Sequence, residues 1–224
     1  MKKLKAYTLM EVMVVMIIMI ILLGLSYSSY TSFTETTKFN EDVSTLQHDI
    51  LVIQRASMLM ERNDEEGWIY GLGIYLGDLG YSTGTGDGAY TFFKWCSEYP
   101  SFTTAMAKEE YPGGEGGVIP TYLNVDEYQC INSGTPEQDN KLVSLIGYGY
   151  GALNLKEDVY IVNSNIAYIV FEAVSGRTFM YDIDGNRVDE DLEIRFDKNF
   201  GTSKILTVKN LTGRTKLSDF VESE

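Results

Sequence analysis

The sequence predicts an α+β fold in which the second half of a long amino-terminal helix packs on an antiparallel β-sheet domain. Three observations support this prediction. An apolar stretch occupies Leu9 to Leu25, apolar residues recur every three or four positions from Phe39 to Met60, and short runs rich in β-branched and aromatic residues follow Gly67. The first two patterns are typical of helices, and the third is typical of strands.

The apolar stretch is long enough to cross a membrane. Its 17 residues would form a helix of about 25 Å, close to the roughly 30 Å hydrocarbon core of a bilayer. Glu11 is its only charged side chain. A carboxylate at the centre of a bilayer costs about 2.5 kcal/mol or more, so Glu11 is expected near an interface or in a pair.

Three interpretations of the amino terminus differ in the fate of its three lysines, Lys2, Lys3 and Lys5. A secretory signal peptide needs a cleavage site flanked by small residues after the apolar stretch, and the SYS that follows is a poor one. A plain signal anchor would keep the lysines, which would hold the amino terminus in the cytoplasm, but it leaves Glu11 unexplained. The third interpretation is a leader that is removed.

The segment KAYTLMEVMVVMIIMIILL resembles the leader and first helix of type IV pilins and pseudopilins. In that family a peptidase cuts a short basic leader on the cytoplasmic side of the membrane. The resemblance places the cut between Ala6 and Tyr7, makes Tyr7 the residue methylated on its nitrogen, and pairs Glu11 with the terminal amine of a neighbouring subunit. Ala6 and Tyr7 replace the commoner glycine and phenylalanine, and Ile20 and Ser28 stand where many major pilins have a glycine and an early proline.

The resemblance implies a structural subunit of a type IV pilus, a type II secretion pseudopilus or a competence filament, assembled through its amino-terminal helix. The expected partners are prepilin peptidase, other pilin or pseudopilin subunits, the membrane and the inner-membrane assembly machinery. Before assembly the chain would be a single-pass membrane protein with a cytoplasmic amino terminus and an extracytoplasmic head. After assembly it would lie in a pilus or at the cell surface. The alternative is a membrane-anchored extracytoplasmic binding domain that does not assemble.

These expectations divide the chain into a leader (1–6), a transmembrane or filament-core helix (7–29), an amphipathic continuation of that helix (30–66) and an exported head (67–224). The continuation carries one apolar stripe: Phe39, Val43, Leu46, Ile50, Ile53, Ser57 and Met60. Its charges are expected on the other faces, at Glu41, Asp42, Asp49, Arg55 and Glu61, and the lone His48 is expected to be solvated. The whole helix would be on the order of 75 to 80 Å long and would end in the polar ERNDEEG run. A coiled coil is the alternative for the stripe, but barely three heptads favour packing on a sheet.

The head is expected to be built from antiparallel strands. The strand-like runs are WIYGLGIYLG, AYTFFKW, KLVSLIGYGYGAL, DVYIV, IAYIVFEAV, RTFMYDI, LEIRF and KILTVKN. Ser175-Gly176 and Asp184-Gly185 are expected to turn hairpins, and the lack of helical crossovers argues against parallel pairing. Glycine-rich and polar stretches between Leu79 and Asn140 are interpreted as loops inserted in one sheet.

The carboxy-terminal ILTVKNLTGRTKL resembles the closing strand and T-G-R turn of minor pseudopilins, and Thr212, Gly213 and Arg214 carry this match. Together with the irregular middle of the chain, it favours a minor pilin or minor pseudopilin.

Two cysteines, Cys96 and Cys130, both lie in the expected head. An even number of cysteines in an exported domain favours a disulfide, with two buried free thiols as the alternative. The chain-entropy model gives a disulfide across this separation about 3 to 4 kcal/mol of stabilisation.

Composition and motifs argue against other functions. The formal net charge is −14, and removal of the leader lysines leaves 15 basic against 32 acidic side chains. So acidic a protein is not expected to bind nucleic acid generally. GTGDG and GGEGG lack the lysine of a phosphate-binding loop, no nucleophile-elbow motif is present, and neither an enzyme nor a cofactor is expected.

Asp182, Asp184 and Asn186 form a calcium candidate because they offer side-chain oxygens at alternating positions. In the EF-hand pattern the glycine follows the third ligand, whereas Gly185 precedes Asn186. A hairpin turn with a solvated acidic face is therefore favoured over a calcium site.

Overall fold

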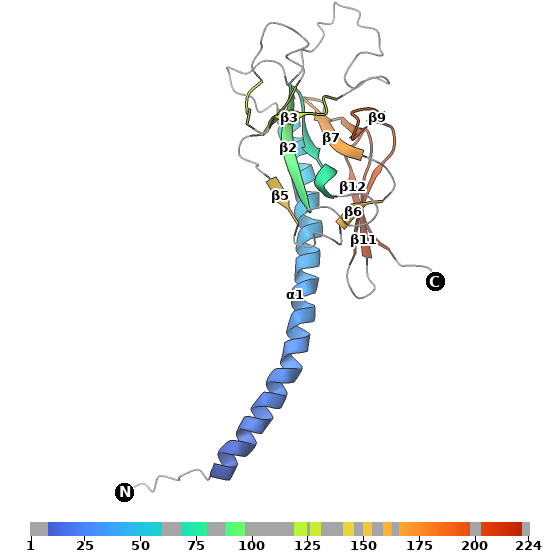
Figure 1. Ribbon diagram of the computed structural model, residues 1–224. Coiled ribbons are helices and arrows are strands. Elements are labelled where there is room, and N and C mark those ends of the chain that lie inside the picture. The colour runs from blue at the N-terminus through green and yellow to red at the C-terminus, as the bar shows by residue number, and fades with distance from the viewer. Residues whose placement is uncertain are drawn as a thin grey trace, which may run out of the picture.

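The computed structural model of the 224-residue chain describes residues 9–59, 69–79, 88–96, 119–124, 126–130, 141–145, 150–153, 159–162, 166–197 and 203–220. One long helix, α1 (Leu9–Leu59), extends from a β-rich head (Figure 1). The head contains a short 3₁₀ helix, η1 (Gly77–Leu79), and the strands β1 (Ile69–Tyr75), β2 (Ala89–Cys96), β3 (Leu123–Asn124), β4 (Lys141–Ser144), β5 (Tyr150–Ala152), β6 (Val159–Ile161), β7 (Ile166–Glu172), β8 (Thr178–Asp182), β9 (Arg187–Val188), β10 (Leu192–Phe196), β11 (Ser203–Val208) and β12 (Thr215–Phe220).

The strands form two sheets. The larger sheet has the order β3-β4-β2-β1-β7-β8-β9, with β5 also paired to β2, and the smaller sheet has the order β12-β11-β10-β6. Among the described strand pairs, all are antiparallel except β3 with β4. The predicted α+β class and the predominance of antiparallel pairing are confirmed.

Two details of the predicted head were wrong. It has two sheets where one was expected, because β6, β10, β11 and β12 pair with one another and not with the larger sheet. It also has one parallel pair, in which Leu123 lies opposite Leu142 and Asn124 opposite Val143. Residues 125–140 separate these two short strands in the sequence, a connection long enough for the crossover that a parallel pair requires.

The predicted strand runs each contain a strand, and KLVSLIGYGYGAL contains two, β4 and β5. Both predicted hairpin turns are present, with Gly176 at φ 64° and Gly185 at φ 86°. These positive φ values are accessible to glycine at little steric cost, which explains its place in both turns. The described strands β3, β9 and β12 lie outside the predicted runs, although β9 and β12 follow the predicted turns at Gly185 and Gly213.

The second half of α1 packs on the larger sheet through the predicted stripe. Phe39, Val43, Leu46, Ile50, Ile53 and Ser57 are all buried, while Met60 and the ERNDEEG stop lie outside the described residues. The apolar members of the stripe share one hydrophobic cluster with residues of β1 and β7, the strands against which α1 lies. The stripe therefore serves packing on a sheet, as predicted.

The buried surface of α1 is wider than the stripe. Asp42, expected on a solvent face, is only 1% exposed, and Asp49 is half-buried. The hydroxyl of Tyr90, on β2, donates to Asp49 Oδ2 at 2.7 Å. Burial raises the pKa of Tyr90, and the charges of Asp49 and Asp42 raise it further, so the phenol stays protonated against this acidic side of the helix. The prediction that Asp42 lies on a solvent face was wrong, because the buried surface of α1 extends beyond the stripe.

The opposite face of the larger sheet carries a second, aromatic cluster. Its rings are those of Tyr70, Phe93, Trp95, Tyr168, Phe179 and Tyr181. Tyr70 and Trp95 meet edge to face with ring centroids 4.8 Å apart, and Trp95 meets Tyr181 in the same way at 5.6 Å. Because both faces of the central strands are buried, these strands appear in the sequence as nearly continuous apolar runs.

The smaller sheet completes the core beside α1. In β10, Leu192, Ile194 and Phe196 are buried and alternate with the half-buried Glu193 and Arg195. These three apolar residues belong to the same cluster as the stripe of α1. One hydrophobic core therefore joins the helix, one face of the larger sheet and one face of the smaller sheet.

Candidate membrane and assembly segment

The first half of α1 exposes its apolar side chains. From Leu9 to Leu25 the large apolar residues are between 49% exposed at Val12 and 81% exposed at Leu9. By length and composition α1 contains a segment that could cross a membrane. Each such side chain gains about 1.5 to 3 kcal/mol when it is fully removed from water. This surface is therefore suited to contact with lipid tails or with other apolar helices.

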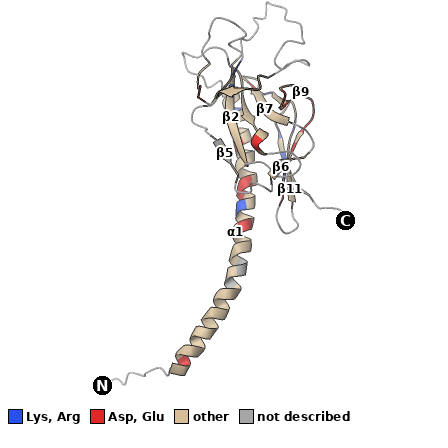
Figure 2. Ribbon diagram, viewed as in Figure 1, with Lys and Arg blue, Asp and Glu red and all other residues tan. Residues whose placement is uncertain are grey.

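Glu11 lies in the first described turn of α1. A carboxylate in this position is stabilised by the amino-terminal end of the helix dipole. Among the described residues, Figure 2 shows one acidic position at the start of α1, where Glu11 lies in the first turn, separated by a long uncharged segment from the charges nearer the head. The uncharged segment runs from Val12 to Thr34.

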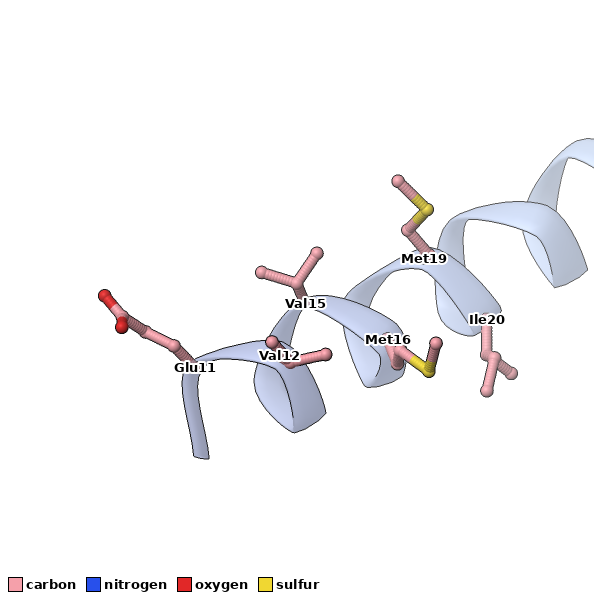
Figure 3. A pocket seen from close by; sticks show the side chains of 6 residues that line it. All are labelled: Glu11, Val12, Val15, Met16, Met19 and Ile20. Carbon is pink, nitrogen blue, oxygen red and sulfur yellow. The ribbon is translucent and has the colours of Figure 1, made fainter. Parts of the chain in front are cut away.

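A shallow groove follows the surface of the helix beside Glu11. Val12, Val15, Met16, Met19 and Ile20 line it together with Glu11. In Figure 3 the carboxylate extends away from the apolar side chains and past the first turn. The segment thus combines a continuous apolar surface with one acid at its end. Ala6 and Tyr7, the expected leader cut and methylation residues, lie outside the described residues.

At the other end of α1, two polar side chains attach the helix to the head. Ser57 Oγ donates to the carbonyl oxygen of Phe171 on β7 at 2.6 Å. Gln54 Nε2 donates to the carbonyl oxygens of Gly176 at 3.2 Å and Thr212 at 3.0 Å. A buried carbonyl oxygen without a donor would cost about 1 to 3 kcal/mol. These hydrogen bonds avoid that cost and so stabilise the contact between this end of α1 and the head.

The closing turn predicted from Thr212, Gly213 and Arg214 lies against this end of α1. Gly213 has φ 63°, and a Cβ atom there would lie 2.5 Å from Thr178 Oγ1 and 2.6 Å from Gln54 Nε2. The turn therefore needs glycine both for its backbone conformation and for the close approach of Gln54.

Cys96 and Cys130 form a disulfide, as predicted. It joins the end of β2 to the segment that precedes β4, and both cysteines are buried. Nearby, Lys94 Nζ donates to the carbonyl oxygen of Tyr128 at 3.3 Å. The disulfide therefore holds part of the irregular middle of the chain against the larger sheet.

Asp182, Asp184 and Asn186 lie in the turn between β8 and β9. Asp182 Oδ1 accepts the backbone N–H of Asn186 at 2.7 Å, and the Asn186 side-chain amide donates to Asp182 Oδ2 at 3.1 Å. Asp184 is exposed. Within the described part of the chain no group of three or more histidine, cysteine or acidic residues is placed to hold a metal ion. The contacts are those of a hairpin turn.

His48 is solvated, as expected, with its side chain 74% exposed. Sequence reasoning missed the polar contacts that fasten α1, namely those of Gln54, Asp49 and Tyr90. It also missed Glu172, which is 1% exposed and accepts from Arg177 Nε at 2.8 Å and from Arg177 Nη2 at 3.0 Å. The one sequence signal for Gln54 was its position next to Ile53 of the stripe, which places it close to the buried face of the helix.

Comparison with known proteins gives no relative: no family model, curated protein or solved structure matches this chain.

Proposed function

We propose that this chain is a pilin-like structural subunit. In this proposal it is held in a membrane by the first half of α1, loses its basic leader between Ala6 and Tyr7, and assembles through α1 into a filament of the type IV pilus, type II secretion or competence kind. The head faces outward from the filament core. The proposal assigns no catalytic chemistry to the chain.

The observation that carries the proposal is the division of α1 into two halves with opposite surroundings. The stripe from Phe39 to Ser57 is covered by the head, whereas the large apolar side chains from Leu9 to Leu25 are about half exposed or more. A membrane is one environment that would cover the exposed half, and the apolar helices of neighbouring subunits are another. A subunit that moves from the membrane into a filament needs an apolar helix surface that can contact both lipid tails and neighbouring helices.

Glu11 supports the proposal that the exposed half of α1 packs against the helices of neighbouring subunits in a filament. A lipid anchor has no need of a carboxylate, and its burial in hydrocarbon costs free energy. In the proposed filament the new terminal amine of a neighbouring subunit would pair with Glu11, and such a pair is favourable only where the two helices are in one register. The cost of Glu11 in lipid would then favour transfer of the helix into the filament.

The test is the mass of the mature protein. The full chain is expressed in bacterial membranes with and without a prepilin peptidase, and its intact mass is measured after extraction. With the peptidase we expect an amino terminus at Tyr7, and without it a terminus at Met1 or Lys2. The uncut chain in the second sample is the matched control, because its anchor and head are identical.

A terminus that stays at Met1 or Lys2 in the presence of an active peptidase would contradict the proposal. It would support instead the membrane-anchored binding domain that keeps its lysines and does not assemble.

A further inference from the structure

Three exposed aromatic residues lie on α1 directly after the apolar segment. Tyr27 is 72% exposed, Tyr30 is 69% exposed and Phe33 is 70% exposed. They follow one another at intervals of three residues, so they occupy neighbouring positions on the helix surface. None of them contributes to the core of the head, whose first residue on α1 is Phe39.

Their height along the helix corresponds to the edge of a bilayer. With Leu9 at one boundary of the hydrocarbon core and a rise of about 1.5 Å per residue, Tyr27 lies roughly 27 Å along the helix, Tyr30 roughly 32 Å and Phe33 roughly 36 Å. The hydrocarbon core is about 30 Å thick, and the headgroup layer adds several Å on each side. The two tyrosines thus fall on either side of the boundary, and Phe33 falls in the headgroup layer.

The residues around these rings suit the same layer. Three threonine hydroxyls of the next turns donate back to the helix: Thr34 to the carbonyl oxygen of Tyr30 at 2.9 Å, Thr36 to that of Ser32 at 2.8 Å, and Thr37 to that of Phe33 at 2.9 Å. Bonded in this way, the hydroxyls need no water partner, which lowers the cost of bringing this part of α1 close to lipid. The first charge after Glu11 is Glu35, two residues beyond Phe33.

We infer that Tyr27, Tyr30 and Phe33 form an interfacial belt that binds the phospholipid headgroup layer and sets how deeply α1 is inserted before assembly. Aromatic side chains favour this layer because their rings are apolar while the tyrosine hydroxyl reaches water and headgroups. The occupant is lipid because the belt begins two residues after the apolar segment ends at Leu25 and because its rings lie at the height of the bilayer boundary. This inference rests on the membrane stage of the proposed function.

The belt also fixes the height of the head. Phe39 is six residues beyond Phe33, which places the first buried contact of the head about 9 Å from the belt along the helix. A head at that height would stand directly on the membrane surface.

The experiment measures depth with nitroxide labels on the full chain. Both native cysteines are bonded to each other, so a single introduced cysteine is the one thiol that the reagent labels. Labels are placed in turn at Ile17→Cys, Ser32→Cys and Lys38→Cys, and the proteins are reconstituted in phosphatidylcholine–phosphatidylglycerol vesicles. Accessibility to oxygen and to a water-soluble nickel chelate gives the depth of each label.

We expect the label at 17 in the hydrocarbon core, the label at 32 in the headgroup layer and the label at 38 in water. In the variant Tyr27→Ser/Tyr30→Ser/Phe33→Ser, the label at 32 should move toward water by about 5 Å, one helical turn. The matched control is Tyr122→Ser, which removes an equally exposed tyrosine from the head and should leave the depth of the label at 32 unchanged.

The outcomes separate this inference from the proposed function. A label at 17 that is exposed to water shows that the helix does not insert, which removes the membrane stage and the belt together. A label at 17 in the core, with the label at 32 at the same depth in the triple variant as in the parent, overturns the belt alone. A label at 32 shielded from both oxygen and nickel shows that a second copy of the chain covers the rings, which also overturns the lipid assignment.

Discussion

Gln54, near the end of α1, donates from Nε2 to the carbonyl oxygen of Thr212, 158 residues later in the chain. The same nitrogen donates to the carbonyl oxygen of Gly176, so one side chain joins the helix to the β7–β8 turn and to the β11–β12 turn. Apolar contacts of the stripe hold one face of α1 against the head. The two hydrogen bonds of Gln54 add directional contacts to two separate turns.

Gln54→Ala should destabilise the head by about 1 to 3 kcal/mol, because two carbonyl oxygens would lose their donor in a poorly solvated place. Urea unfolding followed by tryptophan fluorescence measures the change. The control is Gln47→Ala, on the same helix, where the amide donates to a single hydroxyl, Thr215 Oγ1, at 3.0 Å. Equal losses in the two variants would contradict the role assigned to Gln54.

Gly213→Ala should also destabilise the head, by about 1 to 3 kcal/mol, since alanine at φ 63° is strained and its Cβ would collide with Thr178 and Gln54. The same unfolding assay applies. Gly24→Ala is the control, because a Cβ there meets nothing within 4 Å, so it should leave the stability of the head unchanged. A Gly213→Ala protein as stable as the parent would rule out the tight approach of the closing turn to α1.

The stability of the head should fall as the pH rises above about 10, the ordinary pKa of tyrosine. Burial raises the pKa of Tyr168 to about 12 and also raises the pKa of Tyr90, whose hydroxyl donates to Asp49. The folded state therefore holds these protons more tightly than the unfolded state, so the contribution is complete below pH 10 and is lost above it.

Unfolding midpoints at pH 8, 10 and 11 test this dependence. In Tyr90→Phe the fall between pH 10 and 11 should be less steep, since one proton no longer takes part. Tyr122→Phe, in which the replaced tyrosine is 76% exposed, is the control and should keep the slope of the parent protein. A Tyr90→Phe protein with the parent slope would refute the assignment.

Replacing both Cys96 and Cys130 by serine should cost the head about 3 to 4 kcal/mol, the chain-entropy value for cysteines 34 residues apart. Reduction of the parent protein by dithiothreitol in urea should lower the midpoint to that of the double variant. A reduced parent that unfolds at the oxidised midpoint would show that the bond contributes little to stability.

Glu11→Ala should still be cut before Tyr7, so that its mature mass differs from that of the parent only by the substitution. The stability of the head should be unchanged, and incorporation into filaments should be reduced. Sheared filaments are compared with the membrane fraction by immunoblotting. The control is Glu41→Ala, an exposed acid of α1 beyond the apolar segment. Normal incorporation of Glu11→Ala would remove the pairing role proposed for this carboxylate.

Local periodicity accounts for the parts of this structure that could be predicted. The residues from Phe39 to Ser57 repeat with the period of a helix that meets a single surface, and the turns at Gly176 and Gly185 follow from the backbone freedom of glycine. The disulfide followed from an even cysteine count in the expected exported head. The stripe and the turns depend on residues that are close in sequence. The disulfide could be predicted because two cysteines can form only one intramolecular pair.

The features that escaped prediction depend on partners distant in sequence. Asp42 is buried because the helix is covered on more than one side, and Tyr90, which contacts Asp49, lies 41 residues beyond it. The division of the strands into two sheets depends on which strands pair, for example β6 with β10. The alternation of apolar and polar residues along a strand does not say which other strand it pairs with. The proposed assembly function therefore rests on α1 and its surroundings.

The order in which these contacts become available has a kinetic consequence. β1 pairs with β2, which is close in sequence, but its other partner, β7, lies about a hundred residues later, with Gly71 opposite Glu172. Long-range pairing of this kind slows folding, because a large loop must close before any contact compensates for it. If the first segment of the chain enters the membrane as it is made, as the proposed function requires, the hydrogen bond between Gln54 and Thr212 can form only once the last tenth of the chain has been made. Under the proposed function, the chain would be translocated with its sheet incomplete and its helix held at a lipid surface, and we would expect it to depend on chaperones on that side of the membrane.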